Sequence, residues 1–155
     1  MLFVLFQLGR DRYALAANHV VEVAPLVHLK KIPQAPAGVA GVFDYRGTPV
    51  PVVDLSALLF GVPAALRLST RIVLVRYPVE GGQTFVLGLM APRVTETMAL
   101  EPSDFSPAGV DVENAPYLGP VARTSRGLIQ RVEVNQLLPA TVRDRLFRER
   151  GKGWK

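Results

Sequence analysis

The fold is decided by one stretch of the chain, Tyr45-Arg46-Gly47-Thr48-Pro49-Val50-Pro51-Val52-Val53-Asp54-Leu55. Its Arg46-Gly47 pair predicts a tight turn, because glycine readily adopts the left-handed backbone that such turns require. The two alternating prolines suit an extended strand whose missing N–H donors lie at the edge or rim of a sheet. Asp54 then predicts a cap for a short helical turn over residues 56–60, which Gly61 ends.

Further strand pairs are expected on both sides of this stretch. Residues 38–45 supply the other arm of the hairpin, and three more pairs join 2–8 with 13–15, 71–77 with 84–90, and 117–122 with 127–134. Leu138, Val142 and Leu146 recur every four residues, which predicts one amphipathic helix that ends before Gly151. The pattern as a whole predicts an all-β protein with short helices and a C-terminal helix.

The composition favours the same fold class. The chain has 155 residues, 49% of them hydrophobic, which is enough for a buried core. Glycine and proline, 13 of each, are too frequent for a helical bundle and suit short strands joined by turns. The absence of cysteine, with His19 and His28 as the only histidines, excludes disulfide scaffolds and thiolate or histidine-rich metal sites. No cofactor is expected.

The net charge of +5 is concentrated at the end of the chain. Residues 141–155 hold six basic and two acidic side chains, a net charge of +4, which leaves +1 for residues 1–140. A nucleic-acid-binding body carries clustered excess charge, and residues 1–140 do not. We therefore expect a nearly neutral domain over residues 1–140 followed by a basic C-terminal helix or tail over residues 141–155.

Neither of the most apolar segments predicts targeting or membrane insertion. Residues 1–6 lack a basic region and are too short for a signal peptide. Residues 47–66 are interrupted by Pro49, Pro51, Asp54 and Pro63, whereas a spanning helix needs about 20 cleaner residues. A cytoplasmic protein is expected.

A faint internal repeat relates the two halves of the chain. Tyr13-Ala14-Leu15 and Val20-Val21-Glu22-Val23 align, 74 residues further on, with Leu87-Gly88-Leu89 and Val94-Thr95-Glu96-Thr97. Val53-Asp54-Leu55 aligns, 79 residues further on, with Val132-Glu133-Val134. We expect two similar small β-units packed side by side.

Recognition is better supported than catalysis. Neither histidine is accompanied by a nucleophile motif, so a barrel-fold enzyme that uses His19 or His28 is only a rival interpretation. Arg46 stands on a stiff turn, from which its guanidinium can engage a partner's carboxylate or carbonyl groups. Alternatively, Arg46 pairs with its neighbour Asp44. Glu22 is either an exposed alternating position or one member of a charged contact.

Taken together, these segments resemble the CheW-like adaptor domain of bacterial chemosensory systems. The resemblance starts with Phe6-Gln7-Leu8-Gly9 and Tyr13-Ala14-Leu15 and continues through Val20-Val21-Glu22-Val23, Ile32-Pro33, Ala35-Pro36 and Val39-Ala40-Gly41-Val42. It is strongest over residues 45–55, where the family pattern is Asn-Leu-Arg-Gly followed by Pro-Val and Asp-Leu. The second half fits through Arg71-Ile72-Val73-Leu74-Val75, Gly88-Leu89, Val94, Glu96 and Leu137-Leu138, so about residues 3–140 are covered.

The resemblance implies a fold and a set of partners. The fold would be two intertwined SH3-like five-stranded β-barrels in one domain over residues 1–140, with approximate sub-barrels 1–66 and 67–140 that exchange strands. The protein would be a non-enzymatic adaptor that joins a chemoreceptor's cytoplasmic tip to the regulatory domain of a CheA-type histidine kinase. Other CheW-like proteins of the array would be further partners, with no nucleic acid and no insertion into a membrane.

The resemblance also implies partner-binding residues. The positions that match those linked in the family to partner binding are Val20, Glu22, Gly41, Arg46 and Gly47. Arg46 would be the polar anchor, and an apolar groove between the barrels would take a helical receptor tip.

The chain departs from the family pattern at several positions. Asp44-Tyr45 replaces the usual Asn-Leu, and we add Asp44 to the candidate site because it could hold the Arg46 guanidinium inward and tune partner choice. In the second half, Ala91-Pro92 stands where Val-Asp is common and Glu133 where Asp is common. The second half of the interface is therefore less well defined than the first.

Two finer interpretations concern the pathway and the alternative function. The compact start, residues 1–6, and the Asp-Tyr-Arg-Gly variant resemble the adaptor of Wsp-type surface-sensing systems, whose output is a diguanylate cyclase that makes cyclic-di-GMP. The sequence isoelectric point of about 10.0 keeps a small basic nucleic-acid-binding β-barrel as the alternative.

Overall fold

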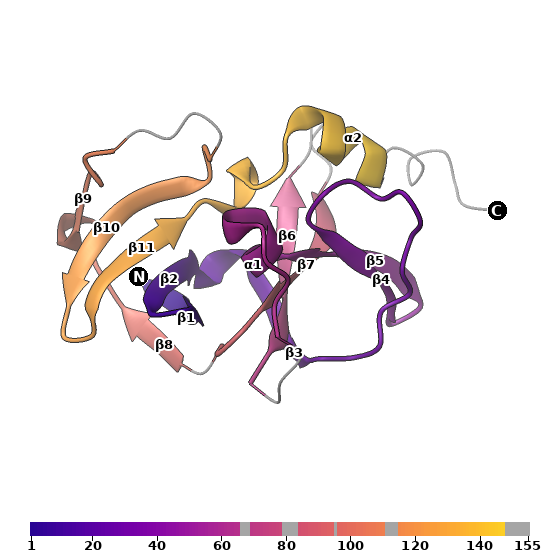
Figure 1. The fold of residues 1–155 in the computed structure, drawn as a ribbon. Coiled ribbons are helices and arrows are strands. Elements are labelled where there is room, and N and C mark those ends of the chain that lie inside the picture. Colours follow the sequence, from indigo (N-terminus) through magenta and orange to yellow (C-terminus); the bar gives the residue numbers. More distant parts are fainter. Residues whose placement is uncertain (66–68, 79–83, 95, 111–114, 148–155) are drawn as a thin grey trace.

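The strands of the computed structural model form two sheets that lie side by side (Figure 1). The structure describes residues 1–65, 69–78, 84–94, 96–110 and 115–147. The strands are β1 (Leu2–Leu8), β2 (Asp11–Ala16), β3 (Val20–Pro25), β4 (Val39–Tyr45), β5 (Thr48–Asp54), β6 (Arg71–Pro78), β7 (Thr84–Ala91), β8 (Glu96–Ala99), β9 (Phe105–Ser106), β10 (Leu118–Thr124) and β11 (Gly127–Val132). Within the described residues, sheet A has the order β8-β1-β2-β11-β10-β9 and sheet B the order β3-β6-β7-β5-β4.

The two sheets repeat one another through the exchange of strands between halves of the chain. The series β1 to β5 recurs as β6, β7, β8, β10 and β11, and the two sheet orders match under this correspondence. Each sheet joins the first two strands of one half to the last three of the other, through the parallel pairs β2 with β11 and β7 with β5. Figure 1 shows this exchange as indigo β1 and β2 beside orange β10 and β11.

The expected fold class is confirmed: the protein is all-β, with two intertwined barrel-like sheets. Sheet A has one more strand than expected, because the two-residue β9 pairs with β10. The parts of the chain before and after residue 66 each supply strands to both sheets.

Three apolar clusters explain why the central strands are apolar on both faces. One face of each strand lines its own barrel, and the other face packs at the seam between the sheets. In β6, for example, Ile72 and Leu74 enter the barrel core of sheet B, whereas Val73, Val75 and Tyr77 enter the seam. Continuous apolar runs such as residues 2–8 and 71–77 follow from this double burial.

The decisive stretch folds as a hairpin, a strand and a short helix. β5 is an inner strand of sheet B, whereas its prolines were expected at the edge or rim of a sheet. Its prolines nevertheless lie where only one neighbour pairs with it, because the register with β7 begins at Val52, after Pro49 and Pro51. The missing proline N–H groups therefore interrupt no ladder between β5 and β7.

Short helices close the two halves. The first half ends in α1 (Leu55–Phe60), which Gly61 terminates in the left-handed conformation. The second ends in η3, a single 3-10 turn (Val134–Gln136), and in α2 (Ala140–Phe147), from which Val142 and Leu146 pack on the seam core. The helix end expected before Gly151 and the chain from residue 148 onward lie outside the described residues.

Candidate functional site

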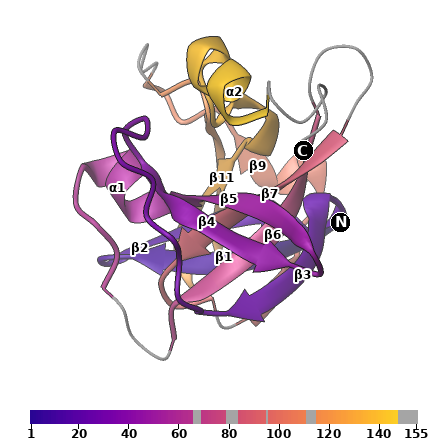
Figure 2. The ribbon, with the colours of Figure 1, turned by 90° about the vertical axis from the view of Figure 1, so that its right-hand side faces the viewer.

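The candidate residues come together at one end of sheet B. Figure 2 views the molecule from the side on which β4 and β5 lie. Val20 and Glu22 belong to β3 at one edge of the sheet, and Gly41 and Asp44 to β4 at the opposite edge. Arg46 and Gly47 form the turn between β4 and β5. Because the sheet curls, its two edges meet at this turn.

Glu22 is the centre of this meeting point. Its Oε1 accepts a hydrogen bond from the Tyr45 hydroxyl at 2.7 Å and pairs with Arg46 Nη2 at 3.2 Å. The Arg46 guanidinium also lies over the Tyr45 ring, 5.2 Å from its centroid. Glu22 was interpreted either as an exposed alternating position or as one member of a charged contact, and the structure shows the charged contact.

The pairing of Arg46 with Asp44, expected from adjacency, is wrong. Among the described residues the carboxylate partner of Arg46 is Glu22, and Asp44 is exposed opposite Pro49. Alternation along β4 explains the difference, because Phe43 and Tyr45 share one face of the strand and Asp44 points to the other. Asp44 therefore does not hold the guanidinium of Arg46.

The turn fixes the backbone at Arg46 and leaves its side chain exposed. Arg46 has a φ of 52° and Gly47 a φ of 85°, the pair of left-handed residues that a tight hairpin turn requires. The Arg46 side chain remains 77% exposed and that of Glu22 40% exposed. An ion pair so exposed contributes little to stability, so its main effect is to orient the guanidinium.

Gly41 and Val20 support this surface from beneath. Gly41 is buried, and a Cβ at this position would lie 2.6 Å from the carbonyl oxygen of Lys30. That close approach belongs to a short antiparallel bridge between Lys30 and Val42, with N–O distances of 2.8 and 2.9 Å. Val20 is half-buried and packs against the seam core.

Two aromatic residues of this surface were not predicted. The Phe43 and Tyr45 rings, both half-buried on β4, meet edge to face at 6.2 Å. Val21 and Val23 are 39% and 41% exposed on β3, but Val23 pairs with Val73 on the face of the sheet opposite to that of Glu22, which pairs with Leu74. The result is an oriented cation beside half-buried aromatic rings.

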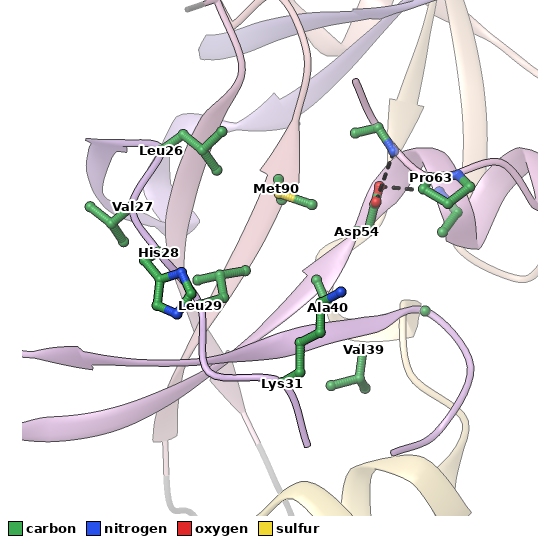
Figure 3. Close-up of a pocket in the computed structure, with 13 residues that line it drawn as sticks. Leu26, Val27, His28, Leu29, Lys31, Val39, Ala40, Asp54, Pro63 and Met90 are labelled. Atoms are coloured by element: carbon green, nitrogen blue, oxygen red, sulfur yellow. Dashed lines mark hydrogen bonds between the residues drawn. The ribbon is translucent and has the colours of Figure 1, made fainter. Parts of the chain in front are cut away.

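An apolar cavity of about 640 Å³ lies at the mouth of the sheet B barrel (Figure 3). Its walls include Leu26, Leu29 and Met90, with His28 and Lys31 among the lining residues. Asp54 also lines it, but its carboxylate accepts backbone hydrogen bonds from Ala57 at 3.2 Å and Ala64 at 2.8 Å. Asp54 is thus a helix cap, as predicted, and its oxygens are occupied by the fold.

The histidines lie apart from one another. His19 stands in a 3-10 turn before β3, where burial, followed by the charge of Arg131, lowers its pKa. His28 is exposed at the cavity of sheet B. The described residues contain no group of three or more His, Asp or Glu that could hold a metal ion. In the same part of the chain, no helix has the length and hydropathy needed to span a membrane.

The four tyrosines give the fold a signature at alkaline pH. Burial raises the pKa of Tyr13, Tyr77 and Tyr117 above 10.0, and the hydrogen bond to Glu22 does the same for Tyr45. We expect tyrosinate absorbance to rise at a higher pH in the folded chain than in urea. The associated stability is fully present below pH 10 and is lost as the pH rises through the folded values. Superimposable titrations of the folded and unfolded chain would contradict this.

Comparisons with known proteins all lead to one family. The model of the CheW-like domain matches residues 2–142. The chain is 27% identical over 144 residues to the chemotaxis protein CheW of Rhizobium meliloti, covering 91% of this chain and 89% of that protein. It is 28% identical over 106 residues to the chemotaxis protein CheW of Helicobacter pylori, covering 68% of this chain and 61% of that protein. The crystal structure of the scaffolding protein TtCheW from Thermoanaerobacter tengcongensis superposes with a TM-score of 0.77 at 25% identity, covering 91% of this chain and 89% of that one.

Proposed function

Since the chain belongs to the CheW-like domain family, we propose that it is a scaffolding protein of chemotaxis signalling that couples a chemoreceptor to a CheA-type histidine kinase. The proposal concerns a binding protein rather than an enzyme. Its mechanism is geometric: the chain holds kinase and receptor in one array, so that receptor conformation biases kinase activity. Individual contacts can be weak, because neighbours in an array supply a high effective concentration.

The observation that carries this proposal is the surface around Glu22 and Arg46. An oriented, exposed guanidinium beside the Tyr45 and Phe43 rings fits a protein interface, in which a few anchors supply most of the binding energy. Arg46, Glu22 and Gly47 lie at this surface and would contact the partner. Asp44 is exposed on the other face of β4 and would also take part in partner binding. Val20 and Gly41 would act indirectly, by positioning the strands that carry these residues.

The two partners would use different parts of the molecule. The Arg46 surface would take one of the two partners, with Arg46 as its polar anchor. The helical tip of the receptor would lie in an apolar groove between the two barrels, the mode in which a helix is recognised through its apolar face. Other CheW-like proteins of the array would be additional partners.

The finer part of the proposal concerns the pathway. The Asp44-Tyr45-Arg46-Gly47 variant supports a Wsp-like surface-sensing system in the cytoplasm, with a diguanylate cyclase as its output. The structural contribution of this variant is Tyr45, whose hydroxyl fixes Glu22 under the guanidinium, a role that a leucine could not perform.

Replacing Arg46 with alanine tests the binding surface. We expect the variant to bind one of the two partners, the kinase regulatory domain or the receptor tip, about 5- to 150-fold more weakly, the equivalent of roughly 1–3 kcal/mol for hydrogen bonds from a charged group. Its far-UV circular dichroism should not change, because the side chain is largely exposed. Titration calorimetry against the kinase domain, and separately against a receptor-tip fragment, measures both affinities.

The matched control is Arg10→Ala, which removes an exposed arginine from the turn before β2 on sheet A. Arg10→Ala should leave the affinities for both partners unchanged. If the unmodified chain binds neither partner, the coupling function is wrong. Strong, salt-dependent binding of an oligonucleotide by residues 1–140 would instead support the nucleic-acid alternative.

A further inference from the structure

A second arginine–glutamate pair occupies the equivalent place in sheet A. Arg126 Nη2 lies 2.8 Å from Glu96 Oε2. Arg126 precedes Gly127 in the turn between β10 and β11, just as Arg46 precedes Gly47 between β4 and β5. Glu96 begins β8 at one edge of sheet A, as Glu22 lies on β3 at an edge of sheet B. Each pair therefore joins a hairpin turn to the strand at the far edge of its own sheet.

The surroundings of the two pairs differ in charge. The Arg46 pair has aromatic neighbours, Tyr45 and Phe43. The Arg126 pair instead borders a small pocket of about 140 Å³. The pocket is lined by Leu5, Phe6, Gln7, Arg12, Arg93, Glu96 and Arg126. Three guanidinium groups against one carboxylate leave the pocket with an excess of positive charge.

The backbone of the fold anchors these arginines. Arg12 lies on β2 opposite Gln7, and its Nη1 donates a hydrogen bond to the carbonyl oxygen of Arg126 at 3.1 Å. Arg93 has a left-handed φ of 51° and follows Pro92, whose carbonyl oxygen accepts a hydrogen bond from the Gln7 N–H at 3.3 Å. Within the described part of the chain, neither Arg12 nor Arg93 forms an ion pair. Their guanidinium groups retain N–H donors for a ligand.

We propose that this pocket binds a side-chain carboxylate from an acidic segment of a protein partner. The planar fork of arginine matches a carboxylate, and two guanidinium groups without ion pairs stand beside one that is already oriented by Glu96. The surface is distinct from the Arg46 surface, where one arginine has aromatic neighbours, because three guanidinium groups gather here around one carboxylate.

The geometry favours a carboxylate over nucleic acid. A volume of about 140 Å³ accommodates one small anionic group rather than a run of phosphates. Glu96 would repel the second and third charge of a phosphate chain. The apolar walls, Leu5 and Phe6, are only 2% and 1% exposed, so they offer no aromatic face on which a base could stack.

The test uses the complete chain and hexaglutamate as the probe. In NMR spectra of the ¹⁵N-labelled chain at low ionic strength, we expect hexaglutamate to shift the amides of residues 5–7, 12, 93, 96 and 126, and hexaglutamine to shift none. The double variant Arg12→Gln/Arg93→Gln should bind hexaglutamate about tenfold more weakly or worse, because hydrogen bonds to charged groups are lost. Arg93 is exposed and Arg12 is half-buried with a hydrogen bond to the Arg126 carbonyl, so the spectrum away from the pocket should superpose on that of the native chain.

The control variant Lys30→Gln removes one positive charge from an exposed side chain near sheet B. It should leave hexaglutamate binding unchanged. The proposal is overturned if hexaglutamate shifts none of these amides, if the double variant keeps the native affinity, or if Lys30→Gln weakens binding as much. Tighter binding of a single-stranded oligonucleotide at the same amides would also overturn it. The experiment requires neither kinase nor receptor, so its failure would leave the coupling function standing.

Discussion

Replacing Gly41 with alanine is expected to lower the free energy of unfolding by roughly 2–4 kcal/mol. The added Cβ would lie 2.6 Å from the Lys30 carbonyl oxygen and 3.0 Å from the Cβ of Leu29, and the φ of +154° disfavours any side chain. Relief would require the chain at Lys30 to move away from β4. That movement would break the two hydrogen bonds between Lys30 and Val42.

Thermal unfolding followed by circular dichroism measures the effect, with an expected decrease in Tm of roughly 4–16 °C. Gly9→Ala is the matched control, because Gly9 also has a positive φ, of 62°, but a Cβ there would meet nothing within 4 Å. Gly9→Ala should lower the free energy of unfolding by only about 1–2 kcal/mol, the cost of holding a residue with a side chain in the left-handed backbone conformation. If both variants unfold at the same temperature, the crowding at Lys30 is not the reason for glycine at position 41.

The Gly41 variant also separates two roles within the candidate site. A residue that contacts the partner changes affinity without changing stability, as expected for Arg46. Gly41 is buried, so any loss of partner binding should be accompanied by a loss of stability. Measuring affinity and Tm on the same samples therefore distinguishes a contact residue from a positioning residue.

Local sequence patterns predicted the elements of the fold well. The hairpin around Arg46-Gly47, the cap at Asp54 and the helix end at Gly61 each depend on residues within a few positions of one another. Contacts between residues so close in the sequence follow the known preferences of residues for turns and helix caps. The internal repeat added long-range information, because it indicated two similar units before any pairing of strands was known.

The partner of Arg46 could not be predicted in the same way. Asp44 is two residues from Arg46 along the chain, whereas Glu22 reaches it only because sheet B curls until its edges meet. A bulge between Val20 and Glu22 further shifts the register of β3 against β6. Curvature and bulges depend on tertiary packing, and residue spacing does not reveal them.

The sequence pattern contained both residues of the second ion pair but did not predict their contact. Glu96 already appeared in the repeat as the counterpart of Glu22, and Arg126-Gly127 stands 80 residues after Arg46-Gly47. Only the structure shows that each arginine meets the glutamate of its own sheet. The repeat therefore carried more structural information than its weak sequence similarity indicated.

Dividing the chain between its halves is expected to abolish folding of each half alone. A fragment of residues 1–65 keeps β1 and β2 but lacks their neighbours β8 and β11, and keeps β3 to β5 without β6 and β7. The fragment of residues 69–155 keeps β6 and β7 without their neighbours β3 and β5, and keeps β8 to β11 without β1 and β2. Isolated hairpins are marginal in water, so each fragment should give an unfolded far-UV spectrum. Equimolar mixing should restore the β-sheet spectrum and give a one-to-one complex in analytical ultracentrifugation.

The lengths of two connections explain why neither half can form a barrel alone. For one half to form a barrel alone, β3 would have to pair with β1 in the antiparallel direction, as β8 does. Because β1 is itself antiparallel to β2, β3 would then run parallel to β2. Parallel strands need a crossover of about a dozen residues or more, but only residues 17–19 separate β2 from β3, and only 92–95 separate β7 from β8. The short links instead place β3 and β8, the third strand of each half, in the sheet that holds the first two strands of the other half. If residues 1–65 alone unfolded cooperatively as a monomer, this account of the exchange would be wrong, because the link would then permit a barrel within one half.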